Sequence, residues 1–294
     1  MDKLKIWFAD FWPEWKDEDF ITPILKNHFE LVLDKNNPDV VFHSIFGHKS
    51  QDFKCKKILF IAENIRNNYN DSIRNNINLA LKVANATISF DPASETNYRL
   101  PLWQVYILMK PEIKDRLYNR KNWAESQFKR WASFTVSNPS NFLRNSAYQQ
   151  LNNYKHVDSY GKYMTTSGEL QSYPQGKYWR DNKDEFFLKN PHKFMIAYEN
   201  TSYPYYCTEK LMDSFLSGSM PIYWGDPKVG EDWNTEAFLD MTRGFDFEKI
   251  KNMDRDWELF RGYYEKPVFT SEQKLRLESN LNGFPIWLLN KIKN

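Results

Sequence analysis

Residues 193–226 decide the fold, and they read KFMIAYENTSYPYYCTEKLMDSFLSGSMPIYWGD. The apolar run at 193–198 is typical of a buried strand, and a polar loop that contains tyrosines follows it. Thr208 is a favoured N-cap residue, and the apolar side chains after it are spaced for one face of a helix that stops at Gly218. A second apolar run at 220–224 predicts a second strand. A strand, a helix and a strand in this order form a βαβ unit, in which the two strands are parallel.

The same alternation of short apolar runs and helical segments extends along the chain. In the first part, the sequence predicts a helix at 75–83 and strands at 5–9, 29–33, 39–43, 57–62 and 87–90. In the second part, it predicts a strand at 132–136, a helix after Asn141 and a further strand that reaches Val157. Two such halves predict an α/β fold in which two Rossmann-like domains face each other across a cleft.

Charge patterning suggests the domain limits. The segment 110–130 is rich in charged residues, and we place the domain boundary near its end. We therefore expect a first domain at 1–128, a second at 129–272, and a C-terminal helical segment at 273–294 that can pack back on the first domain. Pro285 is expected to break the helix of this last segment, because proline removes a backbone donor.

Composition and charge exclude several classes of protein. The net charge of +2 gives no electrostatic hold on nucleic acid. Residues 1–12 lack the apolar core of a signal peptide, and no stretch approaches the ~18 apolar residues of a membrane span. Cys55 and Cys207 form neither a disulfide framework nor a metal-ligand pattern, which fits a reducing compartment. We expect a cytoplasmic protein without a transmembrane segment, and peripheral contact with a membrane stays open.

Two helix starts carry a basic residue where an anion would bind. Arg144 lies in the first turn of the helix after Asn141, and Lys210 lies in the first turn after Thr208. A helix N-terminus offers unpaired N–H groups and partial positive charge, so a cation there opposes the dipole unless an anion binds nearby. A lone arginine on a helix is more often a surface residue, but two such turns in one domain favour a phosphate site.

A carboxylate follows one predicted strand directly. Glu63 comes after the strand at 57–62, and ligands of open parallel sheets bind outside the carboxyl ends of strands. A residue that faces the cleft and a residue that caps the next turn are equally good interpretations. The 17% aromatic content likewise fits either core packing or sugar binding, and Trp12 and Trp15 could stack on a sugar although core packing is the default.

The sequence offers no metal site. Asp254-Arg255-Asp256 resembles the acidic pair that holds a nucleotide-bound cation, but it lies in a charged helical stretch and is interpreted as a solvated face. His43 and His48 have no carboxylates at metal-ligand spacing. We expect neither a metal nor a cofactor.

Several motifs resemble those of one known family. They are Ala197-Tyr198-Glu199-Asn200-Thr201, Tyr206-Cys207-Thr208-Glu209-Lys210 and Met220-Pro221-Ile222-Tyr223-Trp224-Gly225-Asp226-Pro227. The match extends to Phe134–Asn138 with Arg144-Asn145 and to Val157–Lys162, and a short, weaker match lies at Phe60–Asn64. Together they resemble the α1,3/α1,4-fucosyltransferases of glycosyltransferase family ten, which use GDP-fucose and adopt the two-domain GT-B fold. Cys207 stands where that family usually has valine, and the loops near Trp12 and Trp15 match no particular member.

The resemblance implies a role for each matched residue. It makes Glu63 the general base, places Arg144 and Lys210 on the pyrophosphate, and places Tyr160 near the guanine. Asn200, Tyr206 and Glu209 would contact the ribose and the fucose, with Glu209 also stabilising the sugar in the transition state. On the acceptor side the candidates are Trp12, Trp15 and Asn64.

The implied reaction is an inverting, metal-independent transfer of fucose from GDP-fucose to a glycan hydroxyl, with O3 of an N-acetylglucosamine unit as the expected position. Two alternatives stay open. One is a GT-B transferase for another nucleotide sugar, and the other is a glycan-binding protein without catalytic activity, which would not need Glu63 or bind GDP.

Overall fold

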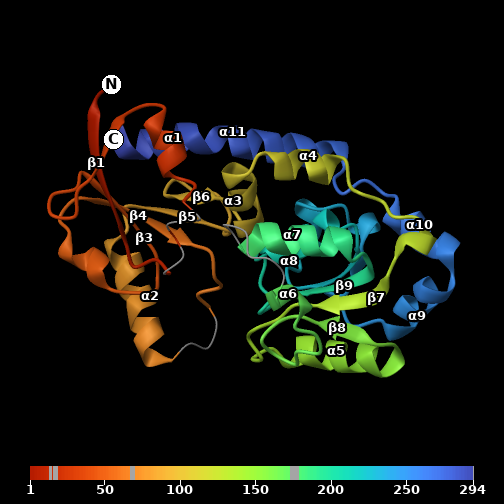
Figure 1. The fold of residues 1–294 in the computed structure, drawn as a ribbon. Coiled ribbons are helices and arrows are strands. Elements are labelled where there is room, and N and C mark those ends of the chain that lie inside the picture. Colours follow the sequence, from red (N-terminus) through yellow and green to blue (C-terminus); the bar gives the residue numbers. More distant parts are fainter. Residues whose placement is uncertain (13–14, 16–18, 67–69, 173–178, 294) are drawn as a thin grey trace. The chain divides into compact units, whose positions relative to one another are not determined.

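The computed structural model describes residues 1–12, 15, 19–66, 70–172 and 179–293, with the backbone alone at 171–172 and 179–181. The chain forms two compact units, one of Met1–Lys110 with Arg276–Asn294 and one of Pro111–Leu275. Each unit contains one sheet, and the paired strands described in both sheets run parallel (Figure 1). The α/β class expected from the sequence is thereby confirmed.

The sheet of the first unit has the order β2-β1-β3-β4-β5-β6. Its strands are β1 (Lys3–Ala9), β2 (Glu30–Leu33), β3 (Val40–His43), β4 (Lys56–Ile61), β5 (Ala86–Ser89) and β6 (Asn97–Arg99). On one face, Ile6, Phe42 and Phe60 belong to a core that also contains side chains of α1 (Thr22–Lys26), α3 (Leu102–Met109) and α11 (Ser271–Lys293). On the other face, Leu59 and Ile61 pack against side chains of α2 (Asp71–Val83).

The sheet of the second unit has the order β11-β10-β9-β7-β8. Its strands are β7 (Arg130–Phe134), β8 (Val157–Ser159), β9 (His192–Tyr198), β10 (Met220–Trp224) and β11 (Leu239–Asp240). One face is covered by α5 (Phe142–Tyr154), α9 (Phe247–Arg255) and α10 (Trp257–Tyr264), and the other by α6 (Glu169–Ser172), α7 (Trp179–Lys189) and α8 (Glu209–Leu216) (Figure 1).

Both sheets reverse their strand order at a defined point. In the first sheet the chain moves outward from β1 to β2 and then returns to β3 on the other side of β1. In the second sheet it moves from β7 to β8 and returns to β9 on the other side of β7. Ligands of open parallel sheets bind at the carboxyl ends of the strands where the order reverses. The ends of β1 and β3, and of β7 and β9, are therefore the places to look for sites.

The boundary between the units differs from the one placed near residue 128. It falls after Lys110, because the charged segment that follows is bound to the second unit. Arg116 belongs to α4 (Glu112–Tyr118), and its Nη1 lies 2.8 Å from Asp184 Oδ2. Arg120 Nη2 donates to the carbonyl oxygen of Ser219 at 2.8 Å. At the other end of the chain, the residues from Arg276 onward belong to the first unit.

Pro285 does not break the last helix, contrary to the expectation. Helix α11 runs continuously from Ser271 to Lys293 with Pro285 inside it. Phe284 and Leu288, on either side of the proline, are fully buried in the core of the first unit. The Tyr98 hydroxyl also donates to the carbonyl oxygen of Asn280 at 2.6 Å. These tertiary contacts offset the hydrogen bond that proline removes.

No helix in the described ranges combines the length and apolarity needed to cross a membrane.

Candidate functional site

Arg144 lies at the point where the second sheet reverses its order. The side chain of Asn141 caps α5 by accepting the backbone N–H of Arg144 at 3.0 Å, so the arginine is fixed in the first turn. Arg144 is 1% exposed. Its Nη1 donates to Asn200 Oδ1 at 2.8 Å, and its Nη2 donates to the carbonyl oxygen of Asn138. The guanidinium therefore bridges the residues that follow β7 and β9.

The guanidinium of Arg144 is charged, but not all of its N–H donors have a hydrogen-bond partner among the described residues. Burial lowers the pKa of its guanidinium, while the charges of Glu199 and Tyr206 act in the opposite direction. Arginine stays protonated in proteins even when buried. Its Nε has no hydrogen-bond partner among the described residues. A buried cation with an unused donor is suited to an anion with several oxygens.

Lys210 sits in a polar cluster at the start of α8. Its Nζ lies 2.9 Å from Thr208 Oγ1, 3.1 Å from Glu209 Oε1 and 3.3 Å from Glu199 Oε2. The lysine and Glu209 keep part of their side chains exposed, whereas Glu199 is fully buried. The cation at this helix start is thus balanced by two carboxylates in the absence of a ligand.

Glu199 is the site residue that the sequence analysis missed. Its Oε1 accepts the backbone N–H of Thr208 at 2.7 Å, and its Oε2 accepts the Thr208 hydroxyl at 2.6 Å. Thr208 is the N-cap residue, as predicted, but its side chain binds Glu199 and does not cap the helix. Burial raises the pKa of the Glu199 carboxyl, and Lys210 and the two Thr208 bonds act against that rise. The available signal was the motif itself, in which Glu199 directly precedes Asn200.

The loop between β9 and α8 is held by Asp226. Its Oδ1 accepts the backbone N–H of Tyr205 at 2.6 Å and that of Lys228 at 2.7 Å, and the aspartate is fully buried. Tyr205 has a backbone φ of 68°, which residues other than glycine rarely adopt, so this contact fixes a strained turn. Tyr206 follows it and is 1% exposed, so it exposes little surface of its own to a nucleotide.

Tyr160 is directed into the interior, away from the position expected near a guanine base. Its ring has no exposed surface and packs edge-on against Phe186 and Phe187. Its hydroxyl accepts from Arg130 Nη1 at 3.1 Å and lies 3.1 Å from His192 Nε2. Of the residues expected to bind the donor, the structure brings together Arg144, Asn200, Tyr206, Glu209 and Lys210 and leaves the Tyr160 side chain outside this group.

The predicted catalytic and acceptor residues lie in the first unit. Glu63 and Asn64 follow β4, with Glu63 half-buried and Asn64 3% exposed. Trp15 is 5% exposed and stacks on Phe11 with ring centroids 3.9 Å apart, so it is a core residue with little surface for a sugar. Trp12 is half-buried and contacts Phe46 edge-on at 5.8 Å.

Phe46 was not predicted, although it is 50% exposed beside Trp12 at the point where the first sheet reverses its order. Its backbone N–H donates to the carbonyl oxygen of Asp10 at 3.0 Å, and the Asp10 carboxylate accepts the N–H groups of Lys49 and Ser50. These bonds tie the loop after β3 to the end of β1 and hold the aromatic pair in place.

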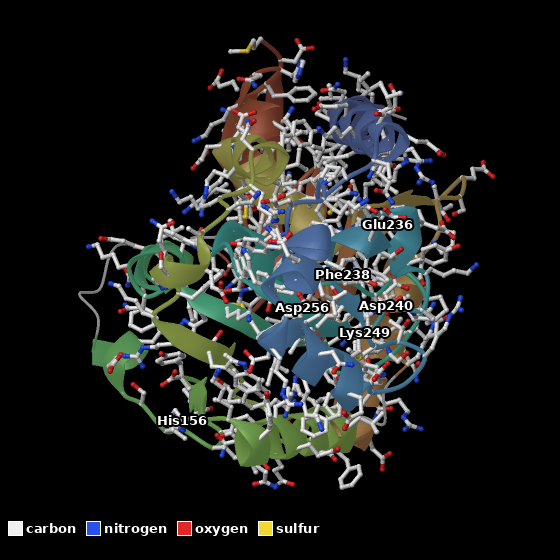
Figure 2. The ribbon with its side chains drawn as sticks, turned by 90° about the vertical axis from the view of Figure 1, so that its right-hand side faces the viewer. His156, Glu236, Phe238, Asp240, Lys249 and Asp256 are labelled. Carbon is white, nitrogen blue, oxygen red and sulfur yellow. The ribbon has the colours of Figure 1, made fainter. Side chains whose placement is uncertain are left out.

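The acidic stretch near the end of α9 is structural. Asp254 is not part of a solvated face, contrary to the expectation: its side chain is 7% exposed, and its carboxylate accepts from Trp131 Nε1 at 2.8 Å and from the Tyr154 hydroxyl at 3.1 Å. Asp256, labelled in Figure 2, caps α10 by accepting the N–H of Leu259 at 3.0 Å. Within the described ranges, no group of three or more His, Cys, Asp or Glu side chains could hold a metal ion.

Comparison with known proteins decides the family. Residues 6–106 match the N-terminal domain of the α-(1,3)-fucosyltransferase FucT, and residues 125–270 match the C-terminal part of glycosyltransferase family 10, the fucosyltransferases. The chain belongs to glycosyltransferase family 10. The α1,3-fucosyltransferase resemblance in the sequence is confirmed.

Individual relatives give the same family. The chain is 28% identical over 313 residues to an α-(1,3)-fucosyltransferase of Helicobacter pylori, which covers 95% of this chain and 63% of the relative. It is 29% identical over 143 residues to the GDP-fucose protein O-fucosyltransferase 3 of Xenopus laevis, covering 46% of this chain and 30% of the relative. It therefore spans less than two thirds of the length of either.

The fold also has a solved counterpart. A crystal structure of an α1,3-fucosyltransferase with GDP-fucose superposes with a TM-score of 0.68 at 23% identity, covering 100% of this chain and 92% of the other. This likeness confirms the GT-B class for the two parallel-sheet units.

Proposed function

We propose that this chain transfers fucose from GDP-fucose to a hydroxyl group of an oligosaccharide or glycoconjugate, with inversion at the anomeric carbon and without a metal ion. The observation that carries the proposal is Arg144, a buried cation that bridges the ends of β7 and β9 where the second sheet reverses its order. The H. pylori relative is named an α-(1,3)-fucosyltransferase, which supports an O3 acceptor position. We propose an N-acetylglucosamine unit as the acceptor sugar.

The second unit is proposed to bind the donor. Arg144 and Lys210 supply positive charge beside the N-termini of α5 and α8, and both helix starts favour a diphosphate. Lys210 is balanced by Glu199 and Glu209 before the donor binds. When a diphosphate binds, Lys210 can exchange its contact with Glu209 for a phosphate oxygen, which leaves the Glu209 carboxylate to accept hydroxyl groups of the ribose or fucose.

The first unit is proposed to bind the acceptor. Glu63 and Asn64 follow β4, which is the neighbour of β3 in the first sheet. Trp12 and Phe46 offer aromatic surface at the neighbouring strand ends, and flat rings cover the apolar face of a pyranose. Glu63 is the proposed base.

The proposed chemistry is a single displacement. Glu63 takes the proton of the acceptor hydroxyl as its oxygen forms a bond to the anomeric carbon of fucose. The bond from that carbon to the β-phosphate oxygen breaks, and GDP leaves with the electron pair. The transition state resembles an oxocarbenium ion, which a carboxylate such as Glu209 stabilises. Arg144 and Lys210 stabilise the charge that develops on GDP, which is the work a metal does in other transferases.

Incubation with GDP-fucose labelled in the sugar and a panel of glycans tests the proposal. We expect label in a glycan that contains N-acetylglucosamine, with GDP released in equal amount. UDP-sugars tested in parallel address the alternative donor. Transfer from a UDP-sugar alone, or no transfer from any donor, would contradict the proposal.

A further inference from the structure

We infer that Glu199 is a positioning residue of the donor site, whose buried carboxylate fixes the start of α8 and the ammonium of Lys210. This inference rests on the proposed function, because it assigns a role to Glu199 through the lysine that is expected to meet the diphosphate. Glu199 has no exposed surface with which to contact a ligand, so its effect on binding has to pass through its neighbours.

The contacts of Glu199 join three parts of the site. Its carboxylate accepts both the N–H and the hydroxyl of Thr208, at 2.7 and 2.6 Å, and lies 3.3 Å from Lys210 Nζ. Its backbone carbonyl accepts Asn141 Nδ2 at 3.1 Å, and Asn141 caps the helix that carries Arg144. One residue is thus bonded to both helix starts that carry a basic side chain.

Burying a charged group is unfavourable unless it is paired, so the position of Glu199 requires an explanation. Glu199 is not the sole support of the loop, because Asp226 also holds it by accepting the backbone N–H of Tyr205. The bond that needs a negative charge is the one to Lys210. Gly225 makes room for the carboxylate, since a Cβ at that position would collide with Glu199 Cγ.

The side chain of Lys210 has long, flexible rotamers, and a first-turn position sets only where its chain begins. Thr208 Oγ1 and Glu199 Oε2 hold its Nζ from one side, while Glu209, the more exposed carboxylate, holds it from the other. If Glu209 exchanges for a phosphate oxygen, Glu199 continues to hold the ammonium in place. Pre-ordering of this kind lowers the entropy that binding must remove.

The substitution Glu199→Gln tests the charge with little change in shape. The amide oxygen can still accept the Thr208 N–H, and the amide group can still bond the Thr208 hydroxyl. The bond to the Thr208 hydroxyl then runs from the amide N–H to the hydroxyl oxygen, and the charge attraction to Lys210 is lost. We expect the GDP dissociation constant to rise about 10-fold or more, which is within the range of coupling between groups of one hydrogen-bonded network.

A double-mutant cycle with Lys210→Met separates positioning from general stability. If Glu199 acts through Lys210, Glu199→Gln should weaken GDP binding by about 2-fold or less in the Lys210→Met background. Equal losses in both backgrounds would overturn the inference, as would unchanged GDP affinity of Glu199→Gln in the wild-type background. Calorimetry measures all four affinities.

The control for a merely structural role is Asp254→Asn. Asp254 is also a buried, ion-paired carboxylate of the second unit, but it contacts Trp131 and Lys193 near the amino-terminal ends of β7 and β9. The Asp254→Asn substitution should lower the melting temperature without changing GDP affinity. Loss of GDP affinity in Asp254→Asn equal to that in Glu199→Gln would show a non-specific effect and overturn the inference.

A second pair of variants serves if Glu199→Gln does not fold. Thr208→Val removes the hydroxyl between Glu199 and Lys210 and should weaken GDP binding, and Thr208→Ser should recover most of that loss. Equal GDP affinity of the two Thr208 variants would contradict the inference. Failure of the proposed function is seen separately, as absence of GDP binding by the wild-type protein.

Discussion

The guanidinium of Arg144 and the side chain of Asn200 are joined by a hydrogen bond of 2.8 Å. The bond links a residue on the helix after β7 to the residue that follows β9, so it spans the position where the second sheet reverses its order. Arg144 is buried here by the fold and is not a surface arginine. The same guanidinium retains a buried Nε without a partner among the described residues.

Arg144→Ala should weaken binding of GDP by roughly 10- to 150-fold, because a charge-assisted hydrogen bond to phosphate is worth about 1.5–3 kcal/mol. Turnover should also fall, since the same cation is proposed to stabilise the leaving GDP. Donor kcat/KM and calorimetric GDP affinity measure the two effects. Arg261→Ala is the matched control, because Arg261 pairs with the exposed Glu258 and is itself half exposed on α10. Wild-type donor kinetics in Arg144→Ala would exclude this helix start as the diphosphate site.

Glu63→Gln should reduce fucose transfer about 10²- to 10⁴-fold, as expected for loss of a general base. GDP affinity and melting temperature should stay close to wild-type values, because the amide keeps the size of the side chain. Glu30→Gln, on the exposed start of β2, controls for loss of a carboxylate in the same unit. A lower melting temperature with near-normal specific activity would instead identify Glu63 as a capping residue, and Glu209 would then be the next candidate for the base.

Trp12→Ala and Phe46→Ala should raise the KM for the glycan acceptor and leave GDP affinity unchanged, because these rings are the partly exposed pair at the end of β1 and β3. Trp15→Ala should act differently. Its ring is buried, and truncating a buried aromatic residue costs about 3–5 kcal/mol of stability. Acceptor kinetics and thermal melting together distinguish the two kinds of variant. An acceptor KM that is unchanged in both Trp12→Ala and Phe46→Ala would remove the aromatic pair from the acceptor site.

Stability of the first unit should fall as the pH falls from 6.5 to 4 because of His43. Burial, with a smaller contribution from Lys57, lowers the pKa of His43 from 6.5 to about 4, while Asp10 acts in the opposite direction. Neither ring nitrogen has a partner among the described residues. The unfolded chain therefore binds more protons than the folded one in this range, and stability is lost by up to about 3 kcal/mol as the pH decreases.

Urea unfolding of wild-type protein and His43→Leu at pH 7, 6, 5 and 4.5 measures this effect. The variant should lose less stability over the range, whatever its stability at pH 7. His48→Gln, at an exposed histidine, should behave like the wild type. Identical pH slopes for wild type and His43→Leu would show that His43 does not titrate as its burial implies.

The sequence predicted the regular elements well where local signals agree. Strand β10 was predicted with its observed limits, because an apolar run follows Gly218, whose φ of 74° is one that glycine readily adopts. Strand β8 was misplaced: it begins at Val157, where the prediction had it end, since α5 continues to Tyr154. The charged helix α4 was not predicted, because its apolar contacts with the second unit are few and distant in sequence.

Side-chain directions were harder to predict than positions. Tyr160 was expected near the guanine from the family resemblance, but its ring is buried and its hydroxyl accepts from Arg130, which also pairs with Asp158. The motif contains Glu199, but the burial of its carboxylate depends on partners at 208 and 210 and on the space left by Gly225. Side-chain positions of this kind depend on tertiary contacts, which the periodicity of the sequence does not predict.

The central claim is that the carboxyl edge of the second sheet binds GDP with its own cations. Titration of GDP into the protein in EDTA, followed by UDP under the same conditions, tests it most directly. We expect the protein to bind GDP with the same affinity with and without the chelator, and to bind UDP much more weakly. Absence of GDP binding in EDTA that manganese restores, or equal affinity for UDP, would contradict it.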